Sequence, residues 1–362
     1  MKNIFDQKYI IDELNKQERW FGNDNIEIDL ILEYGVLADN ALEILRNYPI
    51  LKKLVILHCG NVHDADLAFL ADLNKLKKLF IAGTKCDGSF LQYVNPDVHY
   101  LQFKYSHLER SNARFLERFA NIGQIALEDC GVDDSVVDAL TCQSLNQLRR
   151  IDLYNGRFQK QTERKLVAPN LNSITVVNGL GCANITNIFR ETQQLSHVDL
   201  RYSDFPEDSI IQLLEHAENS NEFLHIDLSG TSASDRTIEF IASSNLRNIN
   251  FLYLDGTRVT QNGVRTLAKS KHSKDIFKLG LTDIDDVDLS LVISSFPDLY
   301  EVQVPYSALS KCNIPSRKLR LETETPRVAI YSVKRKDIQI VFLKTTYEYH
   351  HKLVCRANRY HI

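Results

Sequence analysis

The sequence predicts an α/β solenoid, in which short strands stack into a parallel sheet and a short helix follows each strand. Three observations predict this fold. An apolar triplet recurs about every 25 residues, a small residue follows it at a fixed distance, and a helix-like segment precedes the next triplet. A unit of this size cannot bury its apolar face alone, so stacked neighbours supply the core.

The apolar triplet occupies positions one, four and six of each unit. Eleven units begin between residues 51 and 299, so the mean period is 24.8 residues. A strand that buries one face has its inward side chains two residues apart, which fits positions four and six. The triplets are Leu51/Leu54/Ile56, Leu76/Leu79/Ile81, Val98/Leu101/Phe103, Ile122/Ile125/Leu127, Leu148/Ile151/Leu153, Leu171/Ile174/Val176, Leu195/Val198/Leu200, Phe223/Ile226/Leu228, Ile249/Leu252/Leu254, Ile276/Leu279/Leu281 and Leu299/Val302/Val304.

Position nine of the unit is an independent indication of the repeat. The chain turns away from the sheet there, and a small polar side chain can bond the backbone groups that the turn buries. Eight of the eleven residues are Cys, Thr or Ser, and the other three, Gly156, Gly179 and Ile284, depart from the pattern. In chain order, position nine is Cys59, Thr84, Ser106, Cys130, Gly156, Gly179, Ser203, Thr231, Thr257, Ile284 and Ser307.

The second half of each unit is typical of a short helix. The segments 208–217, 234–242 and 260–268 place Ser, Thr, Asp or Pro ahead of apolar residues at helical spacing. The segment 157–168 is a less apolar example, and we expect a helix there too. Strand, turn and helix therefore alternate within each unit.

The repeat resembles leucine-rich repeats over roughly residues 26–310. Segments such as LYLDGTRVTQNGVRTLA (252–268) look like the cysteine-containing subclass, which is similar to repeats of F-box adaptor proteins and of bacterial cytosolic proteins. The resemblance implies a right-handed solenoid with a concave parallel sheet and convex helices.

The two ends of the chain depart from the repeat, and a stack of strands needs caps there. We assign residues 1–50 to an N-terminal cap helix and a degenerate first repeat, aligned so that Ile28 and Leu30 precede Leu54 and Ile56 by 26 residues. Residues 51–310 hold the repeats. Residues 311–362 form a basic, β-rich cap, in which 331–342 is typical of strand, turn and strand.

Composition favours a cytoplasmic protein. No apolar stretch is long enough for a membrane span, and the N-terminus lacks the apolar core of a secretory signal. The seven cysteines are scattered and form no CxxC pair, which suits free thiols in a reducing compartment. The net charge of −4 combines −12 in residues 1–310 with +8 from Lys311 onward.

The outward strand positions of the third to ninth units supply the candidate binding residues. Tyr and Arg are enriched where proteins dock, and Asp199, Asp227 and Asp255 could form a negative strip for a basic partner segment. A polar outward face is also what solvation alone requires. The candidates are Tyr100, Lys104, Glu128, Arg150, Asp152, Tyr154, His197, Asp199, Arg201, His225, Asp227, Phe251, Tyr253 and Asp255.

Other chemistries have weaker support. His197 and His225, each followed by an aspartate two residues on, could ligate a metal, but solvated polar residues explain them more simply. The C-terminal cluster of His350, His351, Cys355 and His361 matches no zinc spacing, and no nucleotide or metalloprotease motif occurs. We therefore assign no catalytic residue, no metal and no cofactor.

The function that follows is a non-catalytic scaffold that binds another protein through the concave face. One alternative, carried by the subclass resemblance, is the substrate-recognition subunit of a ubiquitin ligase, or a bacterial effector that acts on such a pathway. A second is an enzyme or a nucleic-acid contact in the basic C-terminal region, around Arg317, Lys318, Arg320, Lys334, Arg335 and Lys336. Membrane and small-molecule partners are not expected.

Overall fold

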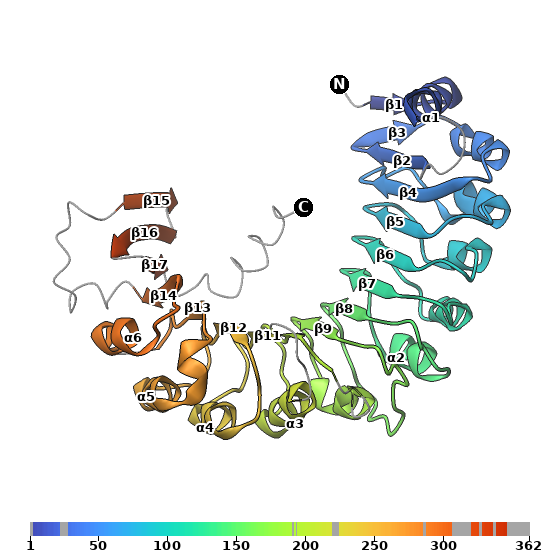
Figure 1. The fold of residues 1–362 in the computed structure, drawn as a ribbon. Coiled ribbons are helices and arrows are strands. Elements are labelled where there is room, and N and C mark those ends of the chain that lie inside the picture. The colour runs from blue at the N-terminus through green and yellow to red at the C-terminus, as the bar shows by residue number, and fades with distance from the viewer. Residues whose placement is uncertain are drawn as a thin grey trace. The chain divides into compact units, whose positions relative to one another are not determined.

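The computed structural model describes most of the chain and divides it into two compact units, residues 1–192 and 193–362. The described residues are 3–21, 28–189, 192, 194–218, 224–284, 287–305, 320–325, 328–335 and 338–345. Each unit repeats the predicted order of strand, turn and helix (Figure 1).

Unit 1 is built on a parallel sheet whose strands follow one another in chain order. A short separate pair, β1 (Asn3–Phe5) with β3 (Gly35–Leu37), lies beside it. The sheet strands are β2 (Ile28–Glu33), β4 (Leu51–Leu57), β5 (Lys78–Ala82), β6 (Tyr100–Lys104), β7 (Gln124–Glu128), β8 (Arg150–Tyr154) and β9 (Ser173–Val177).

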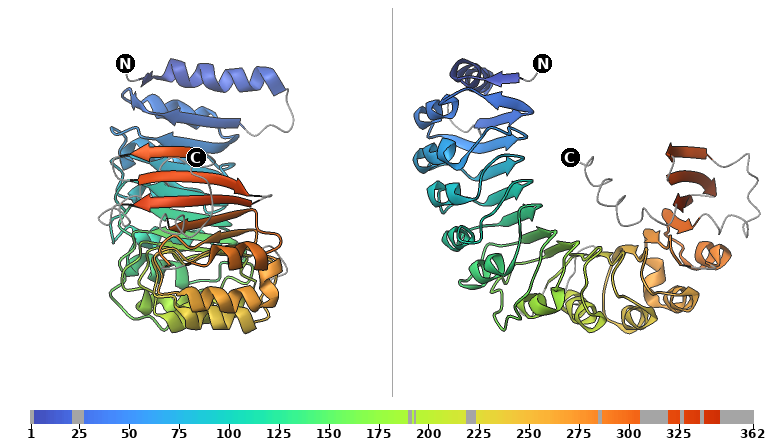
Figure 2. Two further views of the ribbon diagram at one scale, coloured as in Figure 1. Left: turned by 90° about the vertical axis from the view of Figure 1, so that its left-hand side faces the viewer. Right: turned by 180° about the vertical axis from the view of Figure 1, so that it is seen from behind.

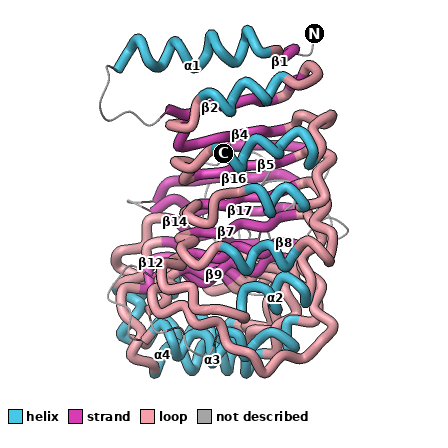
Figure 3. Tube along the Cα trace, turned by 90° about the vertical axis from the view of Figure 1, so that its right-hand side faces the viewer, coloured by secondary structure: helices cyan, strands magenta, loops and turns pink. Residues whose placement is uncertain are grey.

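Apart from α1, the helices of unit 1 lie on one side of this sheet, as Figure 3 shows. Most are 3-10 helices, and they are shorter than ordinary α-helices because each has only half of a repeat to occupy. Helix α1 (Gln7–Phe21) lies next to β2 at the end of the stack (Figure 2). The others are η1 (Ala41–Asn47), η2 (Asp64–Asp72), η3 (Ser89–Tyr93), η4 (Ala113–Arg118), α2 (Asp134–Thr141) and η5 (Cys182–Phe189).

Unit 2 continues the same pattern with α-helices. Its parallel strands are β10 (His197–Asp199), β11 (Leu224–Asp227), β12 (Ile249–Tyr253), β13 (Lys278–Gly280) and β14 (Glu301–Pro305). Strand β17 (Ile338–Thr345) adds to β14 in parallel, and β16 (Val328–Arg335) and β15 (Arg320–Thr325) follow it in antiparallel order. The helices are α3 (Glu207–Ala217), α4 (Asp235–Ser243), α5 (Gln261–Lys269), η6 (Lys271–Lys274) and α6 (Leu289–Ser295).

The described apolar triplets form the core, as the sequence predicts, and Phe223 lies outside the described residues. In unit 1, Leu54 pairs with Leu79, which pairs with Leu101, so one side chain of each strand continues a buried row. These side chains are fully buried. At about 25 cal/mol per Å² of apolar surface, such rows supply the main favourable term of folding.

Position nine also behaves as predicted where it is described, and Ser307 lies outside the described residues. The Cys59 thiol lies 3.7 Å from the carbonyl of Leu32, and the Thr231 and Thr257 hydroxyls donate to carbonyls three residues earlier at 2.6 and 2.7 Å. Burial raises the pKa of the Cys130 thiol at this position to about 12, so Cys130 is a neutral packing residue.

Two expectations about local structure are wrong. The segment 157–168 contains no helix: Thr162 donates its N–H to Asn184 and Leu166 donates to Ile188, so extended backbone replaces the helix. The degenerate repeat is displaced by two residues, because Leu30 pairs with Leu54 and Leu32 with Ile56. A register shift of two residues leaves the same side chains pointing into the core, so the period-two pattern of the strand could not exclude this alignment.

Consecutive repeats are joined by carboxylates at the starts of their helices. In α3, Glu207 Oε1 accepts hydrogen bonds from the backbone N–H groups of Ser234 (2.9 Å) and Thr237 (3.2 Å), and from both hydroxyls at 2.6 Å. In α4, Asp235 accepts the N–H and hydroxyl of Thr260 at 2.7 and 2.6 Å. Each acid thus satisfies donors of the following repeat that the helix itself leaves unpaired.

The same link recurs in unit 1. Asp64 accepts the N–H groups of Asp87 and Phe90, at 2.7 and 2.9 Å. Asp134 accepts those of Gln159 and Lys160, both at 3.1 Å. In every one of these four cases the acid belongs to the earlier repeat.

Candidate functional site

The candidate site is the side of the sheet turned away from the helices, which we call the sheet face. Positions three, five and seven of each strand lie on it, since positions four and six point into the core. Register places equivalent positions in rows across the strands: in unit 1, Lys78 pairs with Tyr100, and Tyr100 with Gln124. All fourteen predicted residues occupy such positions.

Three of the predicted residues form one cluster in unit 1. Lys104 Nζ lies 2.7 Å from a Glu128 oxygen and 5.8 Å from the centroid of the Tyr154 ring. The hydroxyl of Tyr105 donates to Glu128 at 2.6 Å. The cluster is half-buried and its side chains hold one another in place, so little rotamer entropy remains to be lost on binding.

A second pair lies on β8 of the same unit. The Nε of Arg150 lies 2.8 and 2.9 Å from the two carboxylate oxygens of Asp152, which is buried.

Tyr100 stacks on Phe80 with ring centroids 4.5 Å apart, and its hydroxyl donates to Gln102 at 3.1 Å. Burial raises the pKa of Tyr100, and the charge of Asp152 adds to the effect.

In unit 2 the aspartates do not form the open negative strip that we expected. Asp199 and Asp227 are only 5% and 7% exposed, and Arg201 bridges them. Its Nη2 lies 2.7 Å from Asp199, and its Nε lies 3.2 Å from Asp227. Burial, and then the charge of Asp199, raise the pKa of Asp227. Because burying a carboxylate is costly, the sequence had to supply this internal cation.

The third aspartate of that set is less buried. Asp255 accepts the N–H and the hydroxyl of Thr282, both at 2.6 Å. It lies beside Gly280, where a Cβ atom would meet its carboxylate at 2.4 Å. Asp255 therefore helps to fix the end of β13 as well as facing the solvent.

The two predicted histidines lie beside aromatic residues. The rings of His197 and His225 are 4.5 Å apart, and His225 lies 5.4 Å from Phe251 and 5.7 Å from Tyr253. Burial, and next the charge of His197, lower the pKa of His225 to about 4. Burial raises the pKa of Tyr253 to about 12. His225 is therefore a neutral, packed side chain at pH 7.

These residues do not make a metal centre. In the part of the chain that the structure describes, no group of three or more His, Cys, Asp or Glu side chains is placed to hold an ion. The neighbouring carboxylates are instead engaged by Arg201. His350, His351, Cys355 and His361 lie outside the described residues, as do the side chains of the basic C-terminal patch.

Sequence reasoning missed the beginning of the sheet face in unit 1. There the fifth-position residues Ile31, Val55 and Phe80 follow one another across β2, β4 and β5, and we call them the apolar row. Ile31 is 48% exposed. Outward strand positions are expected to be polar, so the apolar residues at three successive outward positions were the sequence signal that could have identified this part of the sheet face.

Lysines and aromatic residues flank the apolar row. Lys52, Lys53, Lys77 and Lys78 lie at the amino ends of β4 and β5, and we call them the lysine row. Tyr34, His58 and Tyr105 follow the carboxyl ends of their strands and form the aromatic strip. The ring of His58 lies 4.7 Å from Tyr34 and 6.2 Å from Tyr105, nearly parallel to both.

The aromatic strip is held by an unusual backbone conformation. Tyr34, His58 and Tyr105 have φ of 55°, 55° and 49°, in the left-handed region. Asn155, in the same place two repeats after Tyr105, has φ 57°. Asn and Gly adopt this conformation at lower cost than bulky residues. The turn itself would therefore favour Asn or Gly, and the three aromatic side chains point to a role other than forming the turn.

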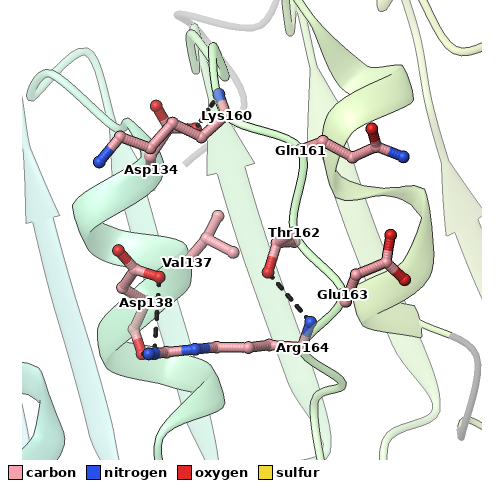
Figure 4. A pocket seen from close by; sticks show the side chains of 8 residues that line it. All are labelled: Asp134, Val137, Asp138, Lys160, Gln161, Thr162, Glu163 and Arg164. Carbon is pink, nitrogen blue, oxygen red and sulfur yellow. Dashed lines mark hydrogen bonds and ion pairs between the residues drawn. The ribbon is translucent and has the colours of Figure 1, made fainter.

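A pocket of about 410 Å³ opens on the helix side of unit 1, where the missing helix of 157–168 leaves space beside α2. Figure 4 shows Arg164 reaching toward Asp138 across the pocket, and their charged groups are 3.5 Å apart. Val137 and Thr162 lie between this pair and Lys160. The charges of the lining nearly balance, so the pocket selects neither an anion nor a cation.

Two solved structures are similar to this chain. An internalin from Listeria monocytogenes matches with a TM-score of 0.52 at 15% identity, over 75% of this chain and 72% of its own. A leucine-rich-repeat protein from Leptospira interrogans matches with a TM-score of 0.38 at 13% identity, over 76% and 75%. No protein-family model and no curated protein sequence matches the chain.

The chain therefore has the leucine-rich-repeat fold, an α/β solenoid of parallel strands and short helices. The cysteine-containing subclass stays a prediction. Within the described residues, no helix combines the length and the apolar character needed to cross a bilayer.

Proposed function

We propose that this chain is a non-catalytic scaffold that binds a partner protein through its sheet face. The observation that carries the proposal is the ordered state of that face before any partner is bound. Lys104, Glu128 and Tyr154 already hold one another, and so do Arg201 and its two aspartates. A surface ordered on folding loses little entropy on association, and Tyr and Arg are the residues that most often carry binding energy.

Photo-crosslinking tests which side of the sheet binds. A benzoyl-phenylalanine is placed at Tyr154 or Tyr253 on the sheet face, or at Tyr93 on the helix side as the matched control. After irradiation in an extract of the cells that make the protein, we expect protein adducts from the first two positions. Adducts from Tyr93 alone would assign binding to the helices and refute the proposal.

Finer assignments stay predictions. These are the substrate-recognition subunit of a ubiquitin ligase, the bacterial effector and the cytoplasmic location. The described residues favour neither of the two roles over the other, and they do not bear on the location.

A further inference from the structure

Two buried carboxylates share one guanidinium on the sheet face of unit 2. Asp199 on β10 and Asp227 on β11 pair directly across the two strands, and both are buried. Arg201 lies against both, and we call these three residues the carboxylate cluster. With both acids ionised, the cluster has a net charge of −1 in a place that solvent hardly reaches. An uncompensated buried charge is costly, so the cluster favours any state that removes it.

The guanidinium is shared unequally between the two acids. Its Nη2 and Nε donate to the two oxygens of Asp199 at 2.7 and 2.8 Å, and the backbone N–H of Arg201 donates to the same carboxylate at 3.2 Å. Its contact with Asp227 is longer, with 3.2 Å between Nε and Oδ2. Asp227 is therefore the acid whose charge the cation compensates less.

The two oxygens of Asp227 also differ from each other. Its Oδ1 accepts the N–H and the hydroxyl of Ser229, at 3.0 and 2.6 Å. A proton on Oδ1 would compete with these two donors, so a proton taken up by Asp227 is placed more easily on Oδ2.

The strands on either side of β11 add negative rather than positive charge. The segments 197–202, 224–230 and 249–256 are all described, and Arg201 is the only Lys or Arg in them. On the next strand, Lys278 lies 3.5 Å from Glu301. Burial, and then the charges of Asp255 and Asp227, raise the pKa of Tyr202, as a negative surrounding should. The titratable groups of the three segments besides Asp227 are His197, Asp199, Arg201, Tyr202, His225, Tyr253 and Asp255.

We propose that the carboxylate cluster is a proton-operated switch, which is neutral while Asp227 holds a proton and which weakens the pairing of β10 with β11 when it releases that proton. The inference goes beyond the proposed function, and it stands even if the sheet face binds no partner. Burial, and then the charge of Asp199, raise the pKa of Asp227, in the direction that the geometry requires. Arg201 and the bonds from Ser229 act the other way and do not outweigh burial.

The sign of the pH dependence follows from this direction. The unfolded chain releases the Asp227 proton near pH 3.9, whereas the folded cluster keeps it to a higher pH. The stabilisation is therefore complete below about pH 3.9 and is lost as pH rises through the folded value. Unit 2 is thus expected to loosen as the solution becomes less acidic.

Carbon-13 NMR of the aspartate carboxyl groups tests the inference on the full chain, with Asp227 assigned through bonds from its own backbone. We expect its titration midpoint to lie about one pH unit or more above 3.9. Asp199→Asn should lower this midpoint by about one unit, because it removes the neighbouring charge and leaves the guanidinium to Asp227. Arg201→Met should raise the midpoint, and a purely structural cluster would not show these opposite shifts.

Urea unfolding between pH 4 and pH 8 tests the consequence for stability. Asp227→Asn cannot titrate, so its urea midpoint should fall less than that of the wild type as pH rises. Asp298→Asn is the matched control, because Asp298 is exposed in the same unit, and its pH profile should follow that of the wild type.

Three results would overturn the inference. The first is a wild-type Asp227 midpoint at or below about 3.9, and this measurement needs no variant. The second is a midpoint that Asp199→Asn leaves unchanged. The third is a urea midpoint that depends on pH equally in the wild type and in Asp227→Asn.

Discussion

The carboxylate of Glu207 offers the sharpest test of how neighbouring repeats stabilise one another. Its Oε1 receives four hydrogen bonds from Ser234 and Thr237 at the start of α4. Losing a helix cap costs about 1 kcal/mol, and losing a charge at a helix N-terminus costs about 0.5 kcal/mol more. With the two hydroxyl contacts, we expect Glu207→Ala to lower the free energy of unfolding by about 2 kcal/mol.

Urea unfolding followed by circular dichroism at pH 7 measures this loss. Glu215→Ala is the matched control, because Glu215 lies exposed on the same helix α3, and its effect should stay below about 0.5 kcal/mol. Hydrogen exchange of the Thr237 amide should also quicken in Glu207→Ala. Equal losses from the two variants would refute the interpretation of Glu207 as a link between repeats.

The pH dependence gives a second readout of the same contact. Burial alone would raise the pKa of Glu207, but the bonds from Ser234 and Thr237 outweigh it and the pKa lies below its usual value. The stabilisation is therefore complete above the unfolded pKa, near 4.3, and is lost as pH falls through the lower folded value. The difference between wild type and Glu207→Ala should shrink below about pH 4.

Three further predictions concern the sheet face. Arg201→Met leaves two buried aspartates without their cation, so urea unfolding should show a loss of about 3 kcal/mol at pH 7. The loss should be smaller at pH 5, because burial raises the pKa of Asp227 and its carboxylate takes up a proton there; an equal loss at both pH values would contradict this. Gly83→Ala places a Cβ against the ring of His58 at φ 62°, and should cost about 1 to 2 kcal/mol in the same assay; an unchanged midpoint would show that the turn relaxes freely. The pKa of His225 is lowered to about 4, so the stabilisation by its neutral ring is complete above pH 6.5 and is lost as pH falls toward 4. The free energy of unfolding of His225→Phe should therefore fall by about 1 to 2 kcal/mol less than that of the wild type between pH 6.5 and pH 4, and identical pH profiles of the two proteins would refute this.

Much of the fold could be predicted because the repeat is a periodic burial pattern. Leu54, Leu79 and Leu101 lie in one buried row because inward positions two residues apart admit only apolar side chains. Thr231 and Thr257 bond the carbonyls that their turns bury. The residue types at such positions are set by the repeat unit and by the two units next to it, and a single sequence contains all of these.

The errors arose where a neighbouring repeat overrides the local pattern. The 157–168 segment is extended because Asp134 and the following repeat bind its N–H groups, and its own residues do not reveal those partners. Outward alternation placed Asp199 on the sheet face but could not show that Arg201 covers it. The apolar row was visible in the sequence, but the expected binding residues were polar or aromatic outward residues of later repeats and did not include it.

The four carboxylate links all point the same way along the chain, and this direction has a consequence for how the protein forms. Asp64, Asp134, Glu207 and Asp235 are each synthesised before the amides that they bind. A finished repeat therefore emerges from the ribosome with the acceptor for its successor in place. Folding can then advance in step with translation, and losing an early repeat should harm the next more than losing a late repeat harms the one before.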